Sequence, residues 1–220
     1  MPTAKAAATD PLDHPALSAS LRALARRGDL RHYRRGTLLI QEGDAGDTLY
    51  IILKGRLRAF SSNAEGDREI TFGTYDPGDY VGEMGLDGGK RSASVITMEA
   101  STCAVVTRQT LEAHLAAEPG FAFELLAKVI RRARAATLSA KQMALNDVYG
   151  RLRALLASAS TALPDGGFET NERLTHQEFS NRLGCSREMV SRVLKDLENG
   201  GYISLTDDRR LRWRHLPARW

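Results

Sequence analysis

The sequence contains few cysteines and no long hydrophobic run. Only two cysteines, Cys103 and Cys185, occur among the 220 residues, so one chain cannot supply the four thiolates of an iron–sulfur cluster. No apolar run approaches the ~18 residues of a membrane-spanning helix, and we expect no membrane association. The small, polar residues 1–11 are expected to form a flexible tail rather than a signal peptide. Two distant thiols without an export signal indicate a reduced, cytoplasmic protein.

Histidines with the spacing of metal ligands are also missing. A cupin-type metal oxygenase needs a cluster of histidines on its strands, whereas the β-forming region offers only His32. This enzyme class is therefore disfavoured. The net charge of +4 permits a polyanionic partner without requiring one. We expect the five scattered histidines at the surface or at helix caps; they are His14, His32, His114, His176 and His215.

Two short amphipathic helices separated by a glycine are predicted near the C-terminus. Residues 175–178, Thr-His-Gln-Glu, have the pattern of a capping box at the start of the first helix, and Gly184 can end it. Ser186 can cap the second helix. A helix-turn-helix of this kind places its second helix in the major groove of DNA. The apolar stripe of that helix consists of Val190, Val193, Leu194 and Leu197.

The polar face of the second helix carries side chains suited to reading base pairs. Arg187 can bind guanine O6 and N7 together, and Glu188 can accept a hydrogen bond from cytosine N4. Glu188 and Arg192 are spaced i,i+4, so an ordinary surface ion pair is the alternative. The candidate DNA-binding residues are Thr175, Gln177, Ser186, Arg187, Glu188, Ser191, Arg192 and Lys195.

The segment from about residue 33 to residue 107 has the pattern of short strands. Runs of β-forming residues alternate with glycine turns, for example at Gly43, Gly55 and Gly66. Turns at intervals of about 8–12 residues predict an all-β sandwich or jelly roll. A helix is predicted before it at residues 12–30, and helical structure is expected again at residues 110–115.

A long helix is predicted from Pro119, in its first turn, to about residue 145. Its length of roughly 40 Å exceeds what a small domain needs. Apolar residues recur along it at the heptad spacing of a helix packed against a partner helix. We expect a symmetric dimer, and the alternative is that the seam packs against the chain's own β-domain. The seam consists of Leu126, Val129, Ala133, Ala136, Ala140 and Met143.

A break at Asn146-Asp147 separates the long helix from another predicted helix at residues 148–158, which Asp147 can cap. A turn and linker at 164–167 precede the helix-turn-helix. A hairpin of residues 202–205 and 211–213 follows it as a wing. The wing arginines, which reach DNA phosphates or form an ordinary solvated face, are Arg209, Arg210, Arg212 and Arg214.

A glycine-rich segment at residues 81–93 has the composition of a site for a sugar phosphate. Glycine N–H groups can approach a ligand closely and form an anion nest. Arg91 supplies a permanently charged fork for a phosphate. Glu83 would repel that phosphate, so we expect it to accept from sugar hydroxyls. The alternative is a glycine-rich turn with a Glu83–Arg91 ion pair.

The chain resembles the Crp/Fnr family of transcription regulators over nearly all of residues 12–213. The matching motifs are Gly-Asp-Thr-Leu-Tyr-Ile at 46–51, Gly-Glu-Met-Gly-Leu at 82–86, Arg-Ser-Ala at 91–93, Asp-Val-Tyr-Gly-Arg at 147–151 and Gly-Cys-Ser-Arg-Glu-Met-Val at 184–190. The resemblance implies an α+β fold with a cyclic-nucleotide-binding β-roll, or jelly roll, at 12–118. It further implies a dimerisation helix at 119–145 and a winged helix-turn-helix at 146–220.

The resemblance also implies which residues hold the effector and which partners the chain has. Gly82, Glu83, Arg91 and Ser92 would hold the cyclic phosphate and ribose. The partners would be a TGTGA-like palindromic site in double-stranded DNA, a second copy of the chain, and RNA polymerase. The candidate effector-binding residues are Phe72, Gly73, Gly82, Glu83, Met84, Gly85, Arg91, Ser92, Ala93, Arg132 and Thr137.

The sequence departs from the catabolite activator branch of this family in three places. The segment between Leu86 and Arg91 is shorter here, and Ala136 stands beside Thr137 where that branch has two adjacent hydroxyl residues. Gly73, beside Phe72, stands where that branch has a serine on a strand. We expect a homodimeric regulator without catalytic activity, gated by cyclic AMP (cAMP). Cyclic di-GMP, with Lys90 and Arg132 as additional cations, is the alternative effector. A ligand-independent regulator with a vestigial pocket is a further alternative.

Overall fold

The computed structural model describes residues 10–66, 69–145 and 147–218, without the side chains of 142–145. The chain divides into two units, one made of Met1–Ser61 with Phe72–Ile130 and the other of Ser62–Thr71 with Arg131–Trp220. Within the described ranges, no helix is long and apolar enough to cross a lipid bilayer.

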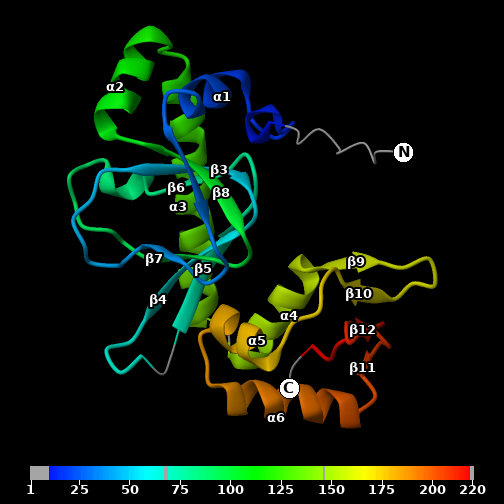
Figure 1. Cartoon of the computed structure of the whole chain (residues 1–220). Helices are drawn as coiled ribbons and strands as arrows, with labels where there is room; N and C mark the ends of the chain where they lie inside the picture. Colours follow the sequence, from blue (N-terminus) through cyan, green and yellow to red (C-terminus); the bar gives the residue numbers. More distant parts are fainter. Residues whose placement is uncertain (1–9, 67–68, 146, 219–220) are drawn as a thin grey trace, which may run out of the picture. The chain divides into compact units, whose positions relative to one another are not determined.

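The first unit is built around two four-stranded sheets, in the strand orders β1-β8-β3-β6 and β2-β7-β4-β5 (Figure 1). Strand β8 pairs antiparallel with both β1 and β3 and is buried along its whole length. This arrangement confirms the predicted β-sandwich. The strands are β1 (Asp29–Tyr33), β2 (Leu38–Ile40), β3 (Leu49–Lys54), β4 (Leu57–Ser62), β5 (Glu69–Tyr75), β6 (Tyr80–Val81), β7 (Ser94–Thr97) and β8 (Ser101–Val106).

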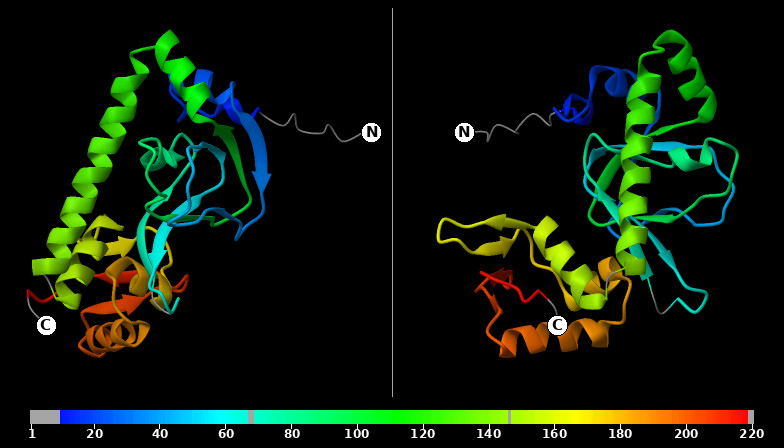
Figure 2. Two further views of the ribbon diagram at one scale, coloured as in Figure 1. Left: turned by 90° about the vertical axis from the view of Figure 1, so that its left-hand side faces the viewer. Right: turned by 180° about the vertical axis from the view of Figure 1, so that it is seen from behind.

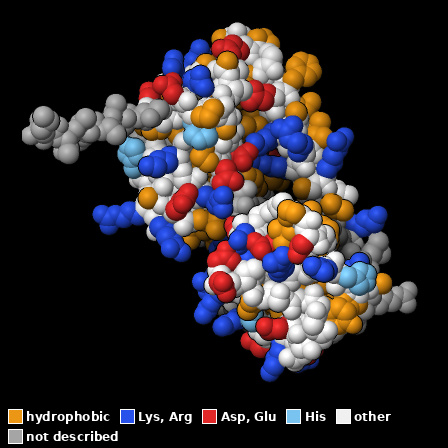
Figure 3. All heavy atoms as spheres, turned by 90° about the vertical axis from the view of Figure 1, so that its right-hand side faces the viewer, with side chains coloured by type: hydrophobic (Ala, Val, Ile, Leu, Met, Phe, Trp, Pro, Cys, Tyr) orange, Lys and Arg blue, Asp and Glu red, His pale blue; other side chains and the backbone are white. Residues whose placement is uncertain are grey.

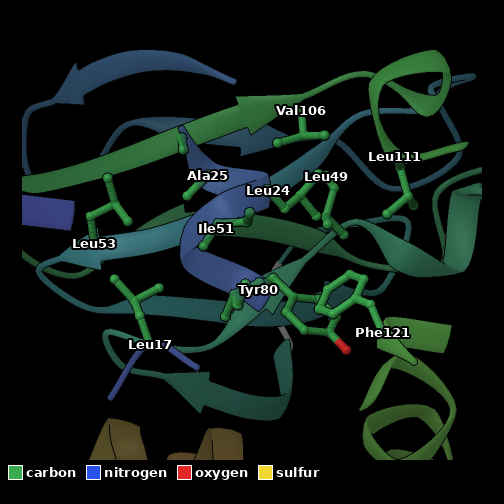
Figure 4. Packing of buried hydrophobic residues seen from close by; sticks show 12 residues of the cluster. Leu17, Leu24, Ala25, Leu49, Ile51, Leu53, Tyr80, Val106, Leu111 and Phe121 are labelled. Atoms are coloured by element: carbon green, nitrogen blue, oxygen red, sulfur yellow. The ribbon is translucent and has the colours of Figure 1, made fainter. Parts of the chain in front are cut away.

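A hydrophobic core lies between helix α1 (Ala19–Ala25) and the first sheet (Figure 4). Leu24 from the helix and Leu49 and Ile51 from β3 are fully buried in it. Burial of each such side chain stabilises the fold by about 1.5–3 kcal/mol. Alternation of buried and partly exposed residues at the start of β3 is the pattern that predicts a strand.

The predicted helix at residues 12–30 is wrong in its extent. The segment forms a short 3-10 helix η1 (Pro11–Asp13), then α1, and then strand β1. His14 is extended because it precedes Pro15, which disfavours helical backbone at the preceding residue. Gly28 ends the helical part, and a Cβ there would lie 2.8 Å from the Val105 carbonyl oxygen. The pairing of β1 with β8 therefore determines the conformation of this segment.

Helices α2 (Arg108–Ala117) and α3 (Phe121–Leu145) follow the sheets, and α3 is one continuous helix (Figure 2). The predicted long helix is confirmed, but it begins at Phe121, so Pro119 precedes it and does not lie in its first turn. Ser18 Oγ donates to both carboxylate oxygens of Glu124 at 2.9 Å. Lys128 forms an ion pair with Asp79, the residue before β6. These contacts fix the first part of α3 to the β-sandwich.

His114 corrects the expectation that the histidines lie at the surface or at caps. Its side chain is fully buried in α2, packed edge-on against Phe121 with ring centroids 5.1 Å apart. Its Nε2 lies 3.2 Å from Ser20 Oγ, which donates to Glu118 at 2.6 Å. This polar contact stabilises the packing of α1 on α2, so His114 is a buried core residue.

The second unit contains helices α4 (Val148–Ser158), α5 (His176–Leu183) and α6 (Arg187–Asn199) and one antiparallel sheet. The sheet has the order β11-β12-β10-β9 and consists of β9 (Ser160–Ala162), β10 (Phe168–Thr170), β11 (Ile203–Leu205) and β12 (Leu211–Trp213). Residues 164–167 therefore form the turn of a hairpin and not a linker. Asn146 of the expected break lies outside the described residues, whereas Asp147 caps α4 as predicted.

Candidate functional site

The glycine-rich segment after β6 forms a tight turn against a neighbouring loop. Gly82 has φ 97°, a left-handed conformation that favours glycine, and the short 3-10 helix η2 (Glu83–Gly85) follows it. A Cβ at Gly82 would lie 2.4 Å from the Thr48 carbonyl oxygen, and one at Gly85 would lie 2.4 Å from that of Gly46. The glycines are therefore required for the close approach of these two backbone segments.

Arg91 connects the two segments and is 7 % exposed. Its Nη1 donates to the Gly82 carbonyl at 2.8 Å. Its Nη2 donates to the carbonyl and to the hydroxyl of Thr48, at 3.0 and 2.9 Å. These bonds use both Nη2 protons and one Nη1 proton, so Nε–H and the other Nη1 proton remain for an anion. No ion pair joins Arg91 to Glu83 in the described structure, and the alternative interpretation of this segment is not supported.

Thr48 is a component of the site that the sequence analysis did not assign. It belongs to the Gly-Asp-Thr motif, but its contact with Arg91 joins residues far apart in the chain. Because the guanidinium is held by two loops at once, its orientation is fixed before any ligand binds. Such preorganisation lowers the cost of ordering a side chain on binding.

The remaining effector candidates of the first unit differ in exposure. Ser92 is exposed, and its Oγ donates to Met84 Sδ at 3.4 Å. Glu83 is partly exposed, and Phe72 on β5 is largely exposed. The other members, Gly73 and Ala93, are partly buried.

Arg132 and Thr137 lie on the part of α3 that belongs to the second unit. The Thr137 hydroxyl donates to the Ala133 carbonyl at 2.9 Å and keeps its lone pairs for an incoming donor. The contact of these two residues with an effector stays a prediction.

The helix-turn-helix has the geometry that its sequence predicts. Thr175 and Glu178 form a reciprocal capping box at the start of α5. Gly184 ends that helix with φ 63°, and the Ser186 side chain accepts from the Met189 N–H at the start of α6. The apolar stripe of α6 is buried in the core of this unit, where it meets Leu152 and Phe179.

The outer face of α6 presents basic side chains that no described acidic residue pairs with. Arg187, Arg192 and Lys195 are exposed and form no ion pair in the described part of the structure. The expected alternative, a Glu188–Arg192 pair, does not form. Instead a backbone N–H and the Ser186 hydroxyl hold the pKa of Glu188 below its ordinary value, so the carboxylate is charged.

The polar groups of the other DNA-binding candidates already form contacts within this unit. Ser191 Oγ lies 2.8 Å from His176 Nδ1, and Gln177 Nε2 donates to Asn181 Oδ1 at 2.8 Å. Thr175 and Ser186 serve as caps. These residues position the two helices, whereas Arg187 and Arg192 are available to a partner.

The wing arginines differ in their availability. Arg210 is paired with Glu169 and Asp208, each at 2.6 Å. Asp165 pairs with Arg212 at 2.7 Å and with Arg214 at 3.3 Å. Arg209, with φ 61° in the turn, forms no ion pair with any described residue. These ion pairs neutralise most of the wing. Acidic and basic side chains also lie close together on the face of the molecule drawn in Figure 3.

The heptad seam of α3 is exposed. Leu126 and Val129 are exposed hydrophobic residues, and Ala133, Ala136 and Ala140 are exposed as well. Phe123 is exposed as well, but it lies three residues before Leu126, whereas the alternating spacing of the seam would place its preceding member at Ala122. The Met143 side chain lies outside the described residues. Packing of Leu126 and Val129 on the chain's own β-domain is therefore not supported.

Comparisons with known proteins agree with both halves of this geometry. Residues 30–118 match the cyclic nucleotide-binding domain, and residues 150–218 match the Crp-like helix-turn-helix domain. The cAMP-activated global transcriptional regulator CRP of Escherichia coli is 32% identical over 182 residues, covering 80% of this chain and 85% of that protein. The cyclic AMP receptor protein of Thermus thermophilus is 32% identical over 176 residues, covering 80% of this chain and 79% of that protein.

A solved structure of the c-di-GMP-responsive global regulator CLP of Xanthomonas campestris superimposes with a TM-score of 0.78 at 25% sequence identity. The match covers 88% of this chain and 98% of that one. The two domain matches, the extended identity with curated relatives and the shared fold lead to one assignment. The chain belongs to the Crp/Fnr family of DNA-binding transcription regulators, and not to a class of enzymes.

Proposed function

We propose that the chain is a homodimeric regulator whose affinity for a palindromic DNA site is controlled by cAMP bound in the β-roll. The observation that carries this proposal is the buried Arg91, held by Thr48 and Gly82 beside a glycine turn. A buried guanidinium with unused N–H groups favours an anion, because its charge is poorly hydrated. Glu83 is the carboxylate that accepts from the ribose.

The size of the site favours an effector with one phosphate and one ribose. The turn offers one buried cation and one ribose-directed carboxylate, whereas cyclic di-GMP brings two phosphates and two guanines. The CRP relative is described as cAMP-activated, and the CLP structure is described as c-di-GMP-responsive. Cyclic di-GMP therefore stays the second candidate, with Lys90 and Arg132 as the additional cations. A ligand-independent regulator is the third.

The DNA site is read by α6. The free fork of Arg187 in the first turn suits guanine, and the ionised Glu188 beside it suits cytosine N4–H. This combination supports a TGTGA-like half-site. Two half-sites about 34 Å apart require two recognition helices. A second copy of the chain, paired along the exposed seam of α3, would provide the second one. RNA polymerase is the proposed further partner.

Calorimetry with cAMP, cyclic GMP and cyclic di-GMP tests the effector. The same nucleotides should then be titrated into the protein bound to a fluorescent palindrome. We expect saturable cAMP binding and a cAMP-dependent change in DNA affinity. Tight cyclic di-GMP binding with no cAMP binding would assign the second candidate. DNA binding that is unaffected by any of the three nucleotides would support the ligand-independent alternative.

A further inference from the structure

Met84 is an exposed thioether inside the proposed effector site. It is 59 % exposed, whereas Met189, on α6, is 36 % exposed. Met98 is partly buried, and nothing structural is described for the side chains of the other two methionines. Met84 is therefore the most accessible described methionine, and it lies in η2 between two glycines of the turn.

The sulfur of Met84 is also the hydrogen-bond partner of Ser92. Ser92 Oγ donates its single proton to Sδ at 3.4 Å. A thioether sulfur is a weak acceptor, so a phosphate oxygen can readily take over this proton. If the sulfur carried an oxygen, the same proton would face a strong acceptor at the same position.

From this contact we propose that Met84 is an oxidation site through which peroxide lowers the affinity for the effector. The inference rests on the proposed function, because it takes Ser92 as a donor to the effector phosphate. The sulfur lone pair attacks one peroxide oxygen and the O–O bond breaks. The departing hydroxide, with the proton lost from the transferred oxygen, leaves as water. The sulfur loses two electrons to become a sulfoxide, and a thiol-dependent reductase reverses the change.

The sulfoxide acts on the effector site in two ways. Its oxygen accepts the hydrogen bond from the Ser92 hydroxyl, so the phosphate no longer receives that bond. Its partial negative charge also lies close to where the phosphate oxygens bind. Loss of one charge-assisted hydrogen bond corresponds to a roughly ten- to hundredfold weaker affinity. The fold is unaffected, because the exposed Met84 side chain supports no core.

The test uses full-length protein treated with hydrogen peroxide and then with dithiothreitol, which reduces oxidised thiols but leaves sulfoxides. Mass spectrometry locates the sulfoxide, and calorimetry measures cAMP binding. We expect Met84 to be oxidised first and cAMP affinity to fall at least roughly tenfold. Methionine sulfoxide reductase should restore it. Met84→Leu should have the same cAMP affinity before and after peroxide treatment, whereas the matched control Met189→Leu should still lose affinity.

Different outcomes separate this inference from the proposed function. If untreated protein binds none of the cyclic nucleotides, the proposed function is wrong. If it binds cAMP but oxidation of Met84 leaves the affinity unchanged, or Met84→Leu stays sensitive, the oxidation site is wrong. In Ser92→Ala, oxidation of Met84 should lower the cAMP affinity much less than it does in the wild type. An equal loss of cAMP affinity in Ser92→Ala would show that diversion of the Ser92 hydrogen bond is not the mechanism.

Discussion

Arg91 combines a structural and a binding role at the scale of a single residue. Its guanidinium satisfies the carbonyls of Thr48 and Gly82, and its remaining N–H groups are assigned to an effector. Arg91→Leu would therefore leave acceptors unpaired and disturb the turn as well as abolish binding. A cleaner change is one that removes a support of Arg91 and leaves its charge in place.

Thr48→Val is that change, because valine keeps the shape of threonine and removes the hydroxyl that accepts from Arg91 Nη2. Loss of one such bond costs about 0.5–1.5 kcal/mol, and we expect cAMP affinity to fall by roughly two- to tenfold. Thr48→Ser restores the acceptor and should restore binding. Calorimetry on both variants measures the effect, and a serine variant as weak as the valine one would contradict the role of the hydroxyl.

Arg187 should read one base pair in each half-site. Arg187→Ala is expected to cost about 1–3 kcal/mol and to relax the preference for one guanine. Selection of binding sites from a random pool checks this. An unchanged selected motif would exclude base readout by this side chain.

The wing contains two neighbouring arginines that can be compared to measure how much phosphate contacts contribute to DNA affinity. Arg209 has no ion pair with a described residue, whereas Arg210 is held by Glu169 and Asp208. Arg209→Ala should weaken binding to all sequences alike and lower the salt slope by about one unit. Arg210→Ala should change the slope less, because its charge is already neutralised. Equal slopes for the two variants would show that the ion pairs of Arg210 open on DNA.

Among the elements, the β9–β10 turn controls the charge of the wing through Asp165. The Gly167 N–H, together with Arg214 and Arg212, holds the pKa of Asp165 below its ordinary value. A carboxyl whose pKa is lowered by folding stabilises the fold above its unfolded pKa. The contribution is lost as the pH falls from about 4 through the lower folded pKa.

Asp165→Asn should therefore destabilise the second unit at neutral pH and reduce the loss of stability on acidification. It also releases Arg212 and Arg214, so binding to non-specific DNA should become tighter. Urea unfolding at several pH values and anisotropy with random DNA measure the two effects. A variant with the wild-type pH profile would show that these exposed ion pairs contribute nothing to stability.

Elements with local end signals could be predicted from the sequence, and those formed by distant pairing could not. The caps Asp147, Thr175 and Ser186 act within one turn of their own helices, and α4, α5 and α6 begin where they predict. Strands β9 and β10 are short, and β10 pairs with β12 far along the chain. The same reason applies to the site: Arg91 was predictable as a cation, but Thr48 as its support was not.

At the scale of the whole molecule, gating requires that the effector bind two arrangements of the dimer with different affinity. The dimer would pack along α3, whose seam starts with large residues and continues with alanines. Leu126 and Val129 can bury apolar area, whereas Ala133, Ala136 and Ala140 allow the two helices to approach closely. A close approach makes the alanine section sensitive to any larger or charged side chain.

Ala136→Glu should consequently break the dimer, because two carboxylates would face each other across a seam with no room for water. We expect a monomer in light scattering and a loss of affinity for palindromic DNA, while affinity for a single half-site stays close to wild type. Ala135→Glu is the matched control, since its side chain is turned about 100° away around the same helix, and it should remain dimeric. If Ala136→Glu stays dimeric with wild-type affinity, the two copies pair through another surface. Dissociation of both variants would mean that added charge anywhere on α3 disrupts the dimer, and the position of the seam would lose its support.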